Sequence, residues 1–476
     1  MMKRIIYTFA LLSAVMMTSV SCKKELGKLP ENAKVDGNTI IDQRTSEIAL
    51  NGAYYRFAAV NGDNITKWFE HEVPPAMFAG YMGYGYGADR AETDNNYAQS
   101  SYANIYWTSS YQLINAANGV IRGVTALDDK RFAGNRKKEV LAEARFLRAY
   151  AHFKLLSFFG QWFDLSSPYG ALIREDFVQV DALPKARSSV KDSYAFILAD
   201  VDDAIANAPA ENQAWYATRW AAMALKMRIL MSHGQPEDYK QVTDLADSII
   251  LHGKYTPEPQ TKDIFYTKGI SSTEVILGIK PQQNQESFYY VLSRQYWPGA
   301  SSLYVAKTAL KDLLQNDPRG AWMIGTENRY AKGTYYFLKY IKQGNSPSIL
   351  SETSYAFRLT EVYLLKAEAV IRSGGSLQAS RNILKEVMGR AGVTDFSAVD
   401  NASSVNDMLK QVYLEIVRNL VAEDGQEWMA LLRLPSSLIQ ELRPTANDKV
   451  KYILPIPHSE FLYNPAIGPQ NPGYQQ

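Results

Sequence analysis

Residues 137–159 read KKEVLAEARFLRAYAHFKLLSFF, and the spacing of their apolar side chains guides the interpretation of the whole chain. The apolar positions follow one another at steps of three and four: Val140, Ala144, Leu147, Ala151, Leu155 and Phe158. Because an α-helix has 3.6 residues per turn, these steps place all of them on one stripe. The stretch therefore predicts an amphipathic helix that packs through this stripe against its neighbours.

The same periodicity recurs along the chain. It predicts further helices at residues 189–206, 217–233, 238–252, 353–373, 376–391 and roughly 404–433. Ser189, with Asp192 three residues later, is close to a capping box and marks a helix start. Short connections such as Gly374-Gly375 return each helix antiparallel to the one before. We therefore expect an all-α, degenerate helical-repeat scaffold without a regular period.

Long stretches without helical periodicity lie between these helices, at residues 61–101, 160–187, 254–300 and 316–352. Within them, the runs Val275-Ile276-Leu277 and Tyr335-Tyr336-Phe337-Leu338 predict short strands that pair inside the loops. Loops of this length in a compact domain usually carry function. No boundary would let half of the chain fold alone, so residues 38–476 are expected to form a single domain.

The composition excludes several functional classes. The chain has 476 residues, with 51 Lys and Arg against 49 Asp and Glu, so it has no basic surplus with which to bind a nucleic acid. Hydrophobic residues make up 46% and aromatic residues 12%, which argues against disorder. With 5 His and 1 Cys, a Cys/His structural zinc site and a disulfide framework are both excluded.

The N-terminus has the order of an export signal. Lys3 and Arg4 precede an apolar run that ends at Ser19-Val20-Ser21-Cys22 and is shorter than a membrane-spanning helix. Residues 1–21 are therefore expected to be a signal peptide, with an uncleaved membrane anchor as the alternative. The last four residues resemble a bacterial lipobox, in which Leu usually stands where Ser19 does, and they predict lipidation of Cys22.

The residues after Cys22 are expected to tether the protein to its lipid. Residues 22–37 are polar and contain Pro30 and Gly37. Removal of the signal peptide leaves 49 basic side chains against 49 acidic ones, so the lipid rather than charge would hold the protein on a membrane. No other segment approaches the roughly twenty apolar residues of a transmembrane helix.

The sequence contains no established catalytic signature. It has no G-x-S-x-G, H-E-x-x-H, P-loop or dinucleotide-binding motif. The glycine-rich segment 83–87 does not join a clear strand to a helix, as a phosphate cradle would. Glu70 and Glu72 would form a glycosidase pair only if the fold gave them the required separation, and His71 is better interpreted as a surface histidine than as a metal ligand. We therefore expect no enzymatic activity.

Residues 89–96 (DRAETDNN) carry enough side-chain oxygens to bind Ca²⁺, but they lack the spacing of an EF-hand. A solvated polar loop is the simpler interpretation. No cofactor is expected, with a structural calcium ion as the minor alternative.

Aromatic side chains concentrate between Trp68 and Tyr102, in a stretch interrupted by glycines. Helical periodicity does not bury such rings, and their exposure costs free energy unless a ligand covers them. A sugar has an apolar C–H face that lies on an aromatic ring, and its hydroxyls bind polar side chains. The predicted stacking residues are Tyr81, Tyr84 and Tyr86, with Trp68 in addition. The predicted hydroxyl-binding residues are Asp89, Arg90 and Asn95.

A second aromatic cluster comprises Tyr289, Tyr290, Tyr296 and Trp297, followed by Pro298-Gly299. Of these, Tyr296 and Trp297 are predicted stacking residues. The alternative for both clusters is that the rings pack beneath their own loops.

The C-terminal sequence is the most specific motif in the chain. Residues 452–460 read YILPIPHSE, and they are followed by Asn464-Pro465 and by QNPGY at 470–474. This string resembles the end of SusD/RagB-like outer-membrane lipoproteins. Further similarities, in the expected order, are EARFLRAY at 143–150, FFG at 158–160, RSSV at 187–190, DVDDA at 200–204 and RLTEVYLLKAEA at 358–369. One segment departs from the family, which usually shows an Arg-rich, Phe-Glu-Gly-type sequence where residues 421–428 read VAEDGQEW.

The resemblance implies an all-α fold of tetratricopeptide-like helix pairs with irregular ligand-binding loops. It also implies a place on the outer face of the outer membrane of Bacteroidetes-type bacteria, with a SusC-like TonB-dependent transporter as partner. Such proteins capture a nutrient, usually an oligosaccharide, pass it to the transporter and perform no bond chemistry. The loop after the first helices and the segment at 289–297 are the positional candidates for the aromatic ligand arc.

Two other functions remain open at this point. A peptide binder of the same fold would hold main-chain groups with polar side chains. A structural scaffold would bury its aromatic residues in the core and bind only the transporter.

Overall fold

The computed structural model describes residues 40–98, 100–178, 184–285, 291–300, 302–341 and 348–475. The predicted signal peptide, the predicted tether with Cys22, and Tyr289 and Tyr290 lie outside these described residues. Within the described ranges, no helix is both long enough and apolar enough to cross a membrane.

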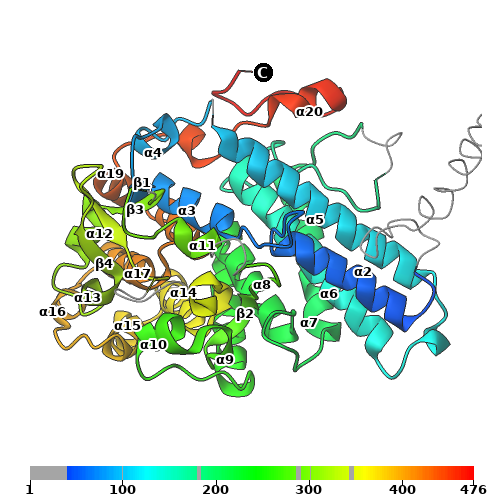
Figure 1. Cartoon of the computed structure of the whole chain (residues 1–476), viewed down its shortest axis with the longest axis horizontal. Helices are drawn as coiled ribbons and strands as arrows, with labels where there is room; N and C mark the ends of the chain where they lie inside the picture. Colours follow the sequence, from blue (N-terminus) through cyan, green and yellow to red (C-terminus); the bar gives the residue numbers. More distant parts are fainter. Residues whose placement is uncertain are drawn as a thin grey trace, which may run out of the picture.

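Long helices form the body of the molecule and pack side by side (Figure 1). They are α2 (Gln43–Phe57), α5 (Ser101–Thr125), α6 (Arg136–Phe159), α7 (Val190–Asn207), α8 (Arg219–His233), α9 (Pro236–His252), α14 (Leu359–Arg372), α15 (Leu377–Arg390) and α17 (Val405–Leu420). From α5 to α9 each helix contacts the next, α9 contacts α14, and α14 packs on α15 and α17. The predicted helical fold of packed pairs is confirmed.

Periodicity located these helices closely. The predicted helix at 137–159 is α6, and the one at 189–206 is α7, where Ser189 Oγ accepts the N–H of Asp192 at 3.0 Å. Gly234 ends α8 in the left-handed conformation, with φ of 69°, as a C-terminal glycine is expected to do.

The sequence interpretation was wrong in three places. The predicted helix at 353–373 begins with a strand, β6 (Ser354–Arg358), and the one at 404–433 is interrupted before α18 (Gln426–Leu432). The predicted loop at 61–101 contains α3 (Phe69–Phe78), which holds Pro74 and Pro75 and is buried along nearly its whole length. A helix buried on all sides has no polar face, so it gives no amphipathic period.

Shorter elements connect the long helices. The helical ones are α4 (Arg90–Thr93), α10 (Thr261–Asp263), α11 (Val291–Arg294), α12 (Thr308–Leu313), α13 (Gly320–Met323), α16 (Ser397–Asp400), α19 (Ser436–Leu442), α20 (His458–Tyr463), the π-helix Ile264–Lys268, and 3₁₀ turns at Asp129–Arg131, Gly269–Ser271, Ile349–Glu352 and Lys449–Tyr452.

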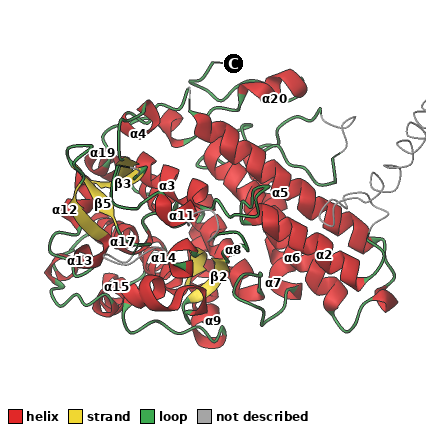
Figure 2. Cartoon of the chain, in the orientation of Figure 1, coloured by secondary structure: helices red, strands yellow, loops and turns green. Residues whose placement is uncertain are grey.

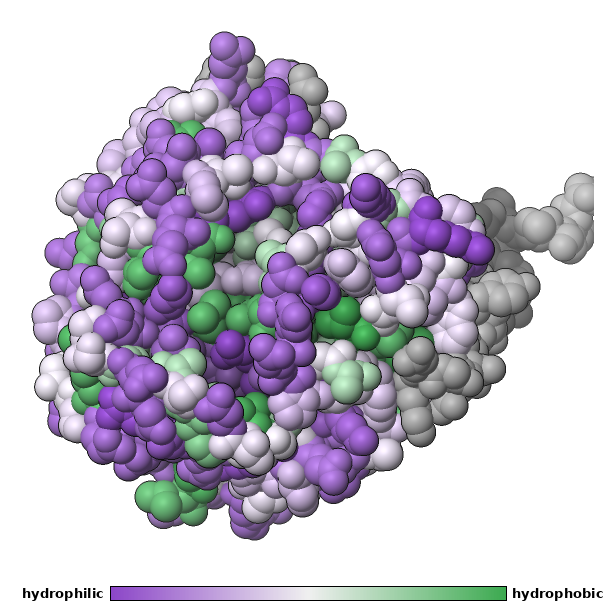
Figure 3. All heavy atoms as spheres, turned by 90° about the vertical axis from the view of Figure 1, so that its left-hand side faces the viewer, coloured by the Kyte–Doolittle hydropathy of each residue, from purple (hydrophilic) through white to green (hydrophobic). Residues whose placement is uncertain are grey.

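Two small antiparallel sheets lie among the helices (Figure 2). The larger has the order β1-β3-β5-β4, with strands Met82–Tyr84, Tyr304–Lys307, Thr334–Phe337 and Ile324–Glu327. The smaller pairs β2 (Val275–Ile279) with β6. Both β-prone runs are therefore strands. As predicted, β5 pairs inside its own loop, with β4, and it also pairs with β3. By contrast, β2 pairs with β6, which is far away in the chain. Seen from the left-hand side of Figure 1, the surface is mostly hydrophilic, with a broken band of apolar side chains across its middle (Figure 3).

The C-terminal segment closes over the end of α6. The N–H of Leu454 donates to the carbonyl of Phe158 at 2.6 Å, and Asn471 Nδ2 donates to the carbonyl of Phe159 at 2.9 Å. Arg187 donates to the same Phe159 carbonyl and to Asn471 Oδ1, at 2.9 and 2.7 Å. Three distant parts of the sequence are thus joined through the last carbonyls of one helix, which have no partner within the helix itself.

The turn between α17 and α18 carries two buried carboxylates into the core. Asp424 accepts hydrogen bonds from Arg228 Nη1 at 2.5 Å and from Tyr150 Oη at 2.7 Å, and it pairs with Lys154 Nζ at 2.7 Å. Arg228 also binds both oxygens of Glu361, at 2.5 and 2.7 Å. Burial opposes ionisation of Asp424, but Lys154 and Arg228 outweigh it and lower the pKa of this carboxyl.

Glu423, the neighbouring residue, holds a second pair of cations. It accepts hydrogen bonds from Arg358 at 2.6 and 2.9 Å and from Lys339 at 2.5 Å. The backbone of the turn has positive φ at Ala422, Asp424 and Gly425, of 57°, 51° and 78°. A Cβ on Gly425 would lie 3.0 Å from Pro75 of α3, so α3 packs directly on the turn. The turn therefore joins α6, α8, β6, α14 and Lys339 after β5 in one ionic cluster, which we call the turn cluster and on which α3 packs.

Asp424→Asn should destabilise the protein strongly. Asparagine adopts the same positive φ, but it leaves Lys154 and Arg228 undercompensated in the core, so the free energy of unfolding should fall by about 3 kcal/mol or more in urea denaturation. The matched control is Asp244→Asn, whose partner Lys240 is 76% exposed and whose loss should cost less than about 1 kcal/mol. Equal effects of the two substitutions would contradict the central role of the turn cluster.

Candidate functional site

The end of β1 presents two tyrosines that differ in exposure. Tyr84 lies opposite Tyr304 in the β1–β3 pairing, with ring centroids 5.8 Å apart, and its hydroxyl hydrogen-bonds the hydroxyl of Tyr102. Tyr84 is half-buried as a result. Tyr86, two residues further on, is 55% exposed. One ring is thus fixed by its neighbours and the other faces solvent.

The glycines on either side of Tyr84 allow close packing rather than flexibility. A Cβ on Gly85 would lie 2.1 Å from the carbonyl oxygen of Ser302, and one on Gly83 would lie 2.4 Å from Glu92 Oε1. Gly85 is also held on both sides, because its N–H donates to the carbonyl of Leu303 at 2.7 Å and its carbonyl accepts from Asn328 Nδ2 at 2.8 Å. Tyr84 and Tyr86 therefore flank a rigid backbone.

Glu70, in the first turn of α3, adds a carboxylate near these rings. Phe69, the residue before it, packs on Tyr304 with ring centroids 6.2 Å apart, and the charge of Glu70 contributes, after burial and Tyr84, to raising the pKa of Tyr304. Within the described part of the chain, no side chain or backbone N–H donates to this half-buried carboxylate. Burial raises the pKa of Glu70, and the positive charge of Lys67 offsets part of this rise. Such a carboxylate is an acceptor available to a ligand hydroxyl.

Asp89 and Arg90 stand at the start of α4. Asp89 Oδ1 accepts the N–H of Glu92 at 2.9 Å, so one oxygen caps the helix while the side chain stays half-buried. The Arg90 side chain is 74% exposed and contacts Asp94 at 3.4 Å. We call Glu70, Tyr84, Tyr86, Asp89 and Arg90 the β1 site. It combines aromatic rings, carboxylates and a guanidinium from β1 and from α4, both of which contact α3.

Two family models match the chain. Residues 24–231 match a model described as "Starch-binding associating with outer membrane", and residues 319–438 match the model of the SusD family. The chain belongs to the SusD/RagB family. Members are nutrient- and sugar-binding proteins of the Bacteroidetes, associated with the outer membrane, and they are binding proteins rather than enzymes.

The similarity extends to named relatives in this SusD family. A SusD-like protein of Bacteroides ovatus is 21% identical over 366 residues, and the match covers 68% of this chain and 63% of the relative. SusD-like protein P2 of Formosa agariphila is 23% identical over 439 residues, covering 81% of this chain and 84% of that protein.

Solved structures of SusD-family proteins share the fold. A SusD superfamily protein from Bacteroides thetaiotaomicron superposes with a TM-score of 0.72 at 20% identity, covering 91% of this chain and 100% of that one. A laminarin-binding SusD-like protein gives 0.70 at 18% identity, with coverages of 91% and 100%. NanU of B. fragilis gives 0.71 at 18%, with coverages of 94% and 100%.

The motifs that carry the SusD resemblance hold the helices together rather than line the β1 site. Arg148 binds both oxygens of Asp200, at 2.7 and 2.8 Å, and Arg145 pairs with Asp203 at 2.6 Å, which joins α6 to α7. Arg358 belongs to the turn cluster. The motifs that identify the SusD fold therefore include no residue of the β1 site. For this reason the motifs alone do not locate the β1 site.

Four of the predicted ligand residues of this SusD-family chain lie in the core. The exposed fractions of Trp68, Tyr81, Asn95 and Tyr296 are 1%, 6%, 0% and 0%. Trp68 packs on Phe57 and His71, Tyr81 on Tyr413 and Tyr296 on Tyr340, with centroids 4.7 to 6.5 Å apart. Asn95 donates to the carbonyl of Phe78 and accepts from Thr445. Their rings and amide are covered by protein, as the alternative interpretation of the aromatic loops expected.

Trp297 lies on the loop that leads into β3 and is half-buried against the core. The carbonyl of Gln295 accepts the N–H groups of Leu303 and Tyr304, both at 2.9 Å, and so folds this loop back onto the strand. Trp297 keeps a partly exposed ring and remains a predicted stacking residue.

The glycosidase and metal interpretations find little support in the described structure. Glu72 is buried in the core and accepts from Tyr340 Oη at 3.4 Å, whereas Glu70 reaches the surface, so the two carboxylates do not share an accessible space. Across the described ranges, no three His, Cys, Asp or Glu side chains are grouped as a metal site would need. Glu92 of the 89–96 segment pairs with Lys307 at 2.7 Å, and calcium binding there stays a prediction.

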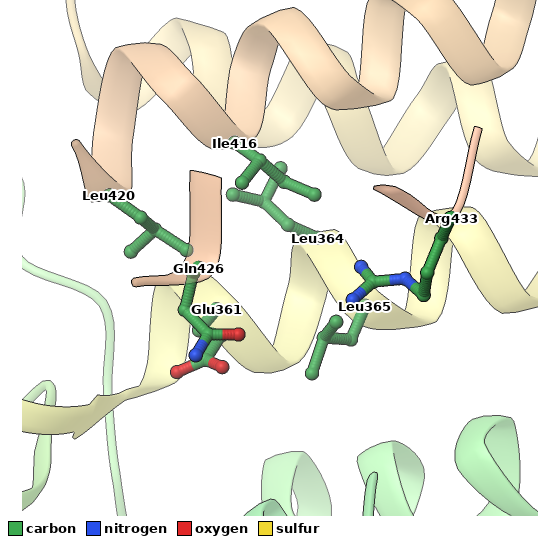
Figure 4. A pocket seen from close by; sticks show the side chains of 7 residues that line it. All are labelled: Glu361, Leu364, Leu365, Ile416, Leu420, Gln426 and Arg433. Carbon is green, nitrogen blue, oxygen red and sulfur yellow. The ribbon is translucent and has the colours of Figure 1, made fainter. Parts of the chain in front are cut away.

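A small space in the core is not a ligand site. It lies between α14, α17 and α18 and is lined by Leu364, Leu365, Ile416, Leu420 and the polar residues Glu361, Gln426 and Arg433 (Figure 4). It is too small to admit a water molecule, and Glu361 and Gln426 lie together at one end of it. This space is a packing gap beside the turn cluster.

Sequence reasoning missed Glu70 as a member of the β1 site and Tyr304 as the ring that packs against Tyr84. Glu70 was weighed only as half of a catalytic pair, and Tyr304 lay outside both aromatic clusters. The signal available was the β-prone run Tyr304-Val305-Ala306, which could have indicated a strand pairing with the Gly-Tyr-Gly-Tyr segment. The register that places Tyr304 opposite Tyr84 depends on tertiary contacts, so the sequence pattern does not give it.

Glu427 of α18 gives a pH-dependent test of the interior. It is fully buried, and burial raises its pKa to about 8, although the backbone N–H groups of Glu427 and Ala422 and the charge of Lys339 act in the opposite direction. The unfolded chain ionises this group near its ordinary pKa of 4.5. Between these two values unfolding releases a proton, so this residue lowers stability by about 1.4 kcal/mol for each pH unit as pH rises.

Glu427→Gln should remove this dependence. The free energy of unfolding of the variant minus that of the wild type should increase from pH 5 to pH 8 and then level off, measured by urea denaturation at each pH. Glu441→Gln, at a 52% exposed side chain of α19, is the matched control and should show no such increase. A difference that stays constant from pH 5 to pH 8 would contradict a neutral Glu427 in the folded protein.

Proposed function

We propose that this protein is a lipid-anchored surface protein that captures an oligosaccharide at the β1 site and passes it to a SusC-like TonB-dependent transporter, without bond chemistry. The observation that carries the proposal is the exposed ring of Tyr86, two residues after the fixed ring of Tyr84, with the unpartnered carboxylate of Glu70 on α3, which packs against β1.

The chemistry of the β1 site matches a sugar. The apolar C–H face of a pyranose covers an exposed tyrosine ring and relieves its unfavourable hydration. Glu70 and Asp89 supply acceptors for hydroxyl protons, and Arg90 supplies donors for ring and hydroxyl oxygens. Because the glycines fix the backbone between the tyrosines, little conformational entropy is lost on binding.

The anchoring and the partner follow from other features. The Cys22 lipobox and the polar tether support a lipid anchor, and one matched family model describes proteins associated with the outer membrane. The transporter is the partner that membership of this family implies. The laminarin-binding relative of the same fold is consistent with a glycan ligand.

The first test is affinity electrophoresis of the mature protein through gels that contain a panel of polysaccharides. Retardation by one or more glycans would support capture and name the substrate class. Unchanged migration in every gel, from protein shown to be folded by circular dichroism, would contradict the proposal and favour a peptide ligand or a scaffold.

Tyr86→Ala should weaken binding to a retarding glycan at least about tenfold, because it removes the exposed stacking face. The ring is 55% exposed, so the free energy of unfolding should change by less than about 0.5 kcal/mol. The matched control is Tyr463→Ala on α20, where a 71% exposed tyrosine lies outside the site. Equal binding by the two variants would exclude Tyr86 from the glycan site.

A further inference from the structure

The turn between β4 and β5 is fixed in one conformation. The side-chain oxygen of the buried Asn328 accepts the N–H of Tyr330 at 3.0 Å. Gly333, with φ of 74°, donates its N–H to Glu327 Oε1 at 3.0 Å, and its carbonyl accepts the hydroxyl of Thr308 at 2.8 Å. A turn held in this way presents its outward side chains at defined positions.

Arg329 and Tyr330 are two of these outward side chains. The Arg329 guanidinium lies over the Tyr330 ring, 4.8 Å from the centroid, and Nη2 donates to the Tyr330 hydroxyl at 2.6 Å. Tyr330 is 44% exposed, and Arg329 is exposed as well. Among the residues that the structure describes, no carboxylate pairs with Arg329. The turn therefore holds a cation in place without neutralising it.

This turn adjoins the β1 site. The side-chain nitrogen of Asn328 donates to the carbonyl of Gly85, the residue before Tyr86, at 2.8 Å. The same asparagine thus binds the turn that carries Arg329 and the bend that carries Tyr86. Tyr86 comes directly after Gly85, and Tyr330 comes two residues after Asn328. Both tyrosine side chains are exposed.

A guanidinium in this arrangement is suited to an oxyanion. Its planar set of N–H groups matches two oxygens of a carboxylate or a sulfate, and stacking on a ring with one hydrogen bond to a phenol restricts its rotamers before a ligand arrives. Glu327, the acidic residue of the turn, is engaged with Gly333.

We propose that Arg329 and Tyr330 form an anion subsite that extends the β1 site and selects an acidic oligosaccharide, whose sugars carry carboxylate or sulfate groups. This inference rests on the glycan-capture function proposed above and adds the chemical class of the glycan. The ring of Tyr86 would hold one sugar, and Arg329 would hold the charged group of a neighbouring one.

The test uses affinity electrophoresis with paired polymers. Polygalacturonate and dextran sulfate are the acidic probes, and carboxyl-reduced polygalacturonate and dextran are their neutral counterparts. The mature protein should be retarded more by at least one acidic probe than by the neutral counterpart of that probe. The polygalacturonate pair tests recognition of a carboxylate, and the dextran pair tests recognition of a sulfate. Arg329→Ala should raise the apparent dissociation constant for the acidic probe at least about tenfold. Arg329→Lys should give a dissociation constant between those of the wild type and Arg329→Ala, because lysine keeps the charge but lacks the paired N–H donors of the guanidinium.

Arg44→Ala is the matched control. It removes the same charge from an exposed arginine at the start of α2 and should leave retardation unchanged. Retardation by neutral polymers only, no effect of Arg329→Ala, or equal losses in the two alanine variants would overturn the anion subsite. Glycan capture would survive these results if Tyr86→Ala still weakened binding to the retarding polymer. Retardation by no polysaccharide would overturn both proposals.

Discussion

Two consecutive carboxylates, Glu423 and Asp424, pair with four cations in the core, and the arrangement of the helices depends on these ion pairs. Glu361 and Glu274 supply the other two negative charges, to Arg228 and Arg358. Arg228, Lys154, Arg358 and Lys339 come from separate parts of the chain and converge on one turn. Removing charges from water costs several kcal/mol for each ion unless the partners are well placed. The turn therefore tolerates positive φ at Ala422 and Asp424, because the ion pairs on both sides determine its backbone.

The β1 site depends indirectly on this cluster. Gly425 packs against Pro75, which fixes α3, and α3 carries Glu70 at its first turn. The strand that follows α3 is positioned by contacts of Gly83 and Gly85 that leave no room for a side chain. The surface residues of the site are thus presented by a framework whose own residues are buried, and the exposed residues can change without disturbing the fold.

Much of the helical fold could be predicted from the sequence, because one-sided burial leaves a period, as in α7 and α9. The hydrophobic period does not predict a helix that is buried on all sides, such as α3. It also does not predict a turn that distant charges hold in place, such as the one between α17 and α18. The aromatic loop shows a different limit. Spacing could identify Tyr84 and Tyr86 as candidates, yet Trp68 and Tyr81 belong to the same stretch and lie in the core. Which rings face solvent is decided by partners such as Phe57 and Tyr413, far away in the sequence.

The long separation between the partners of the turn cluster has a consequence for how the chain is made. Arg228 and its partner Asp424 are 196 residues apart, and Tyr150 and Asp424 are 274 apart. Synthesis proceeds from the N-terminus, so α6 and α8 exist long before the acids that neutralise their cations. These cations lack Glu423 and Asp424 until about residue 424 of 476 has been added, and burying them without those acids is costly. Closure of this part of the core therefore requires almost the entire chain.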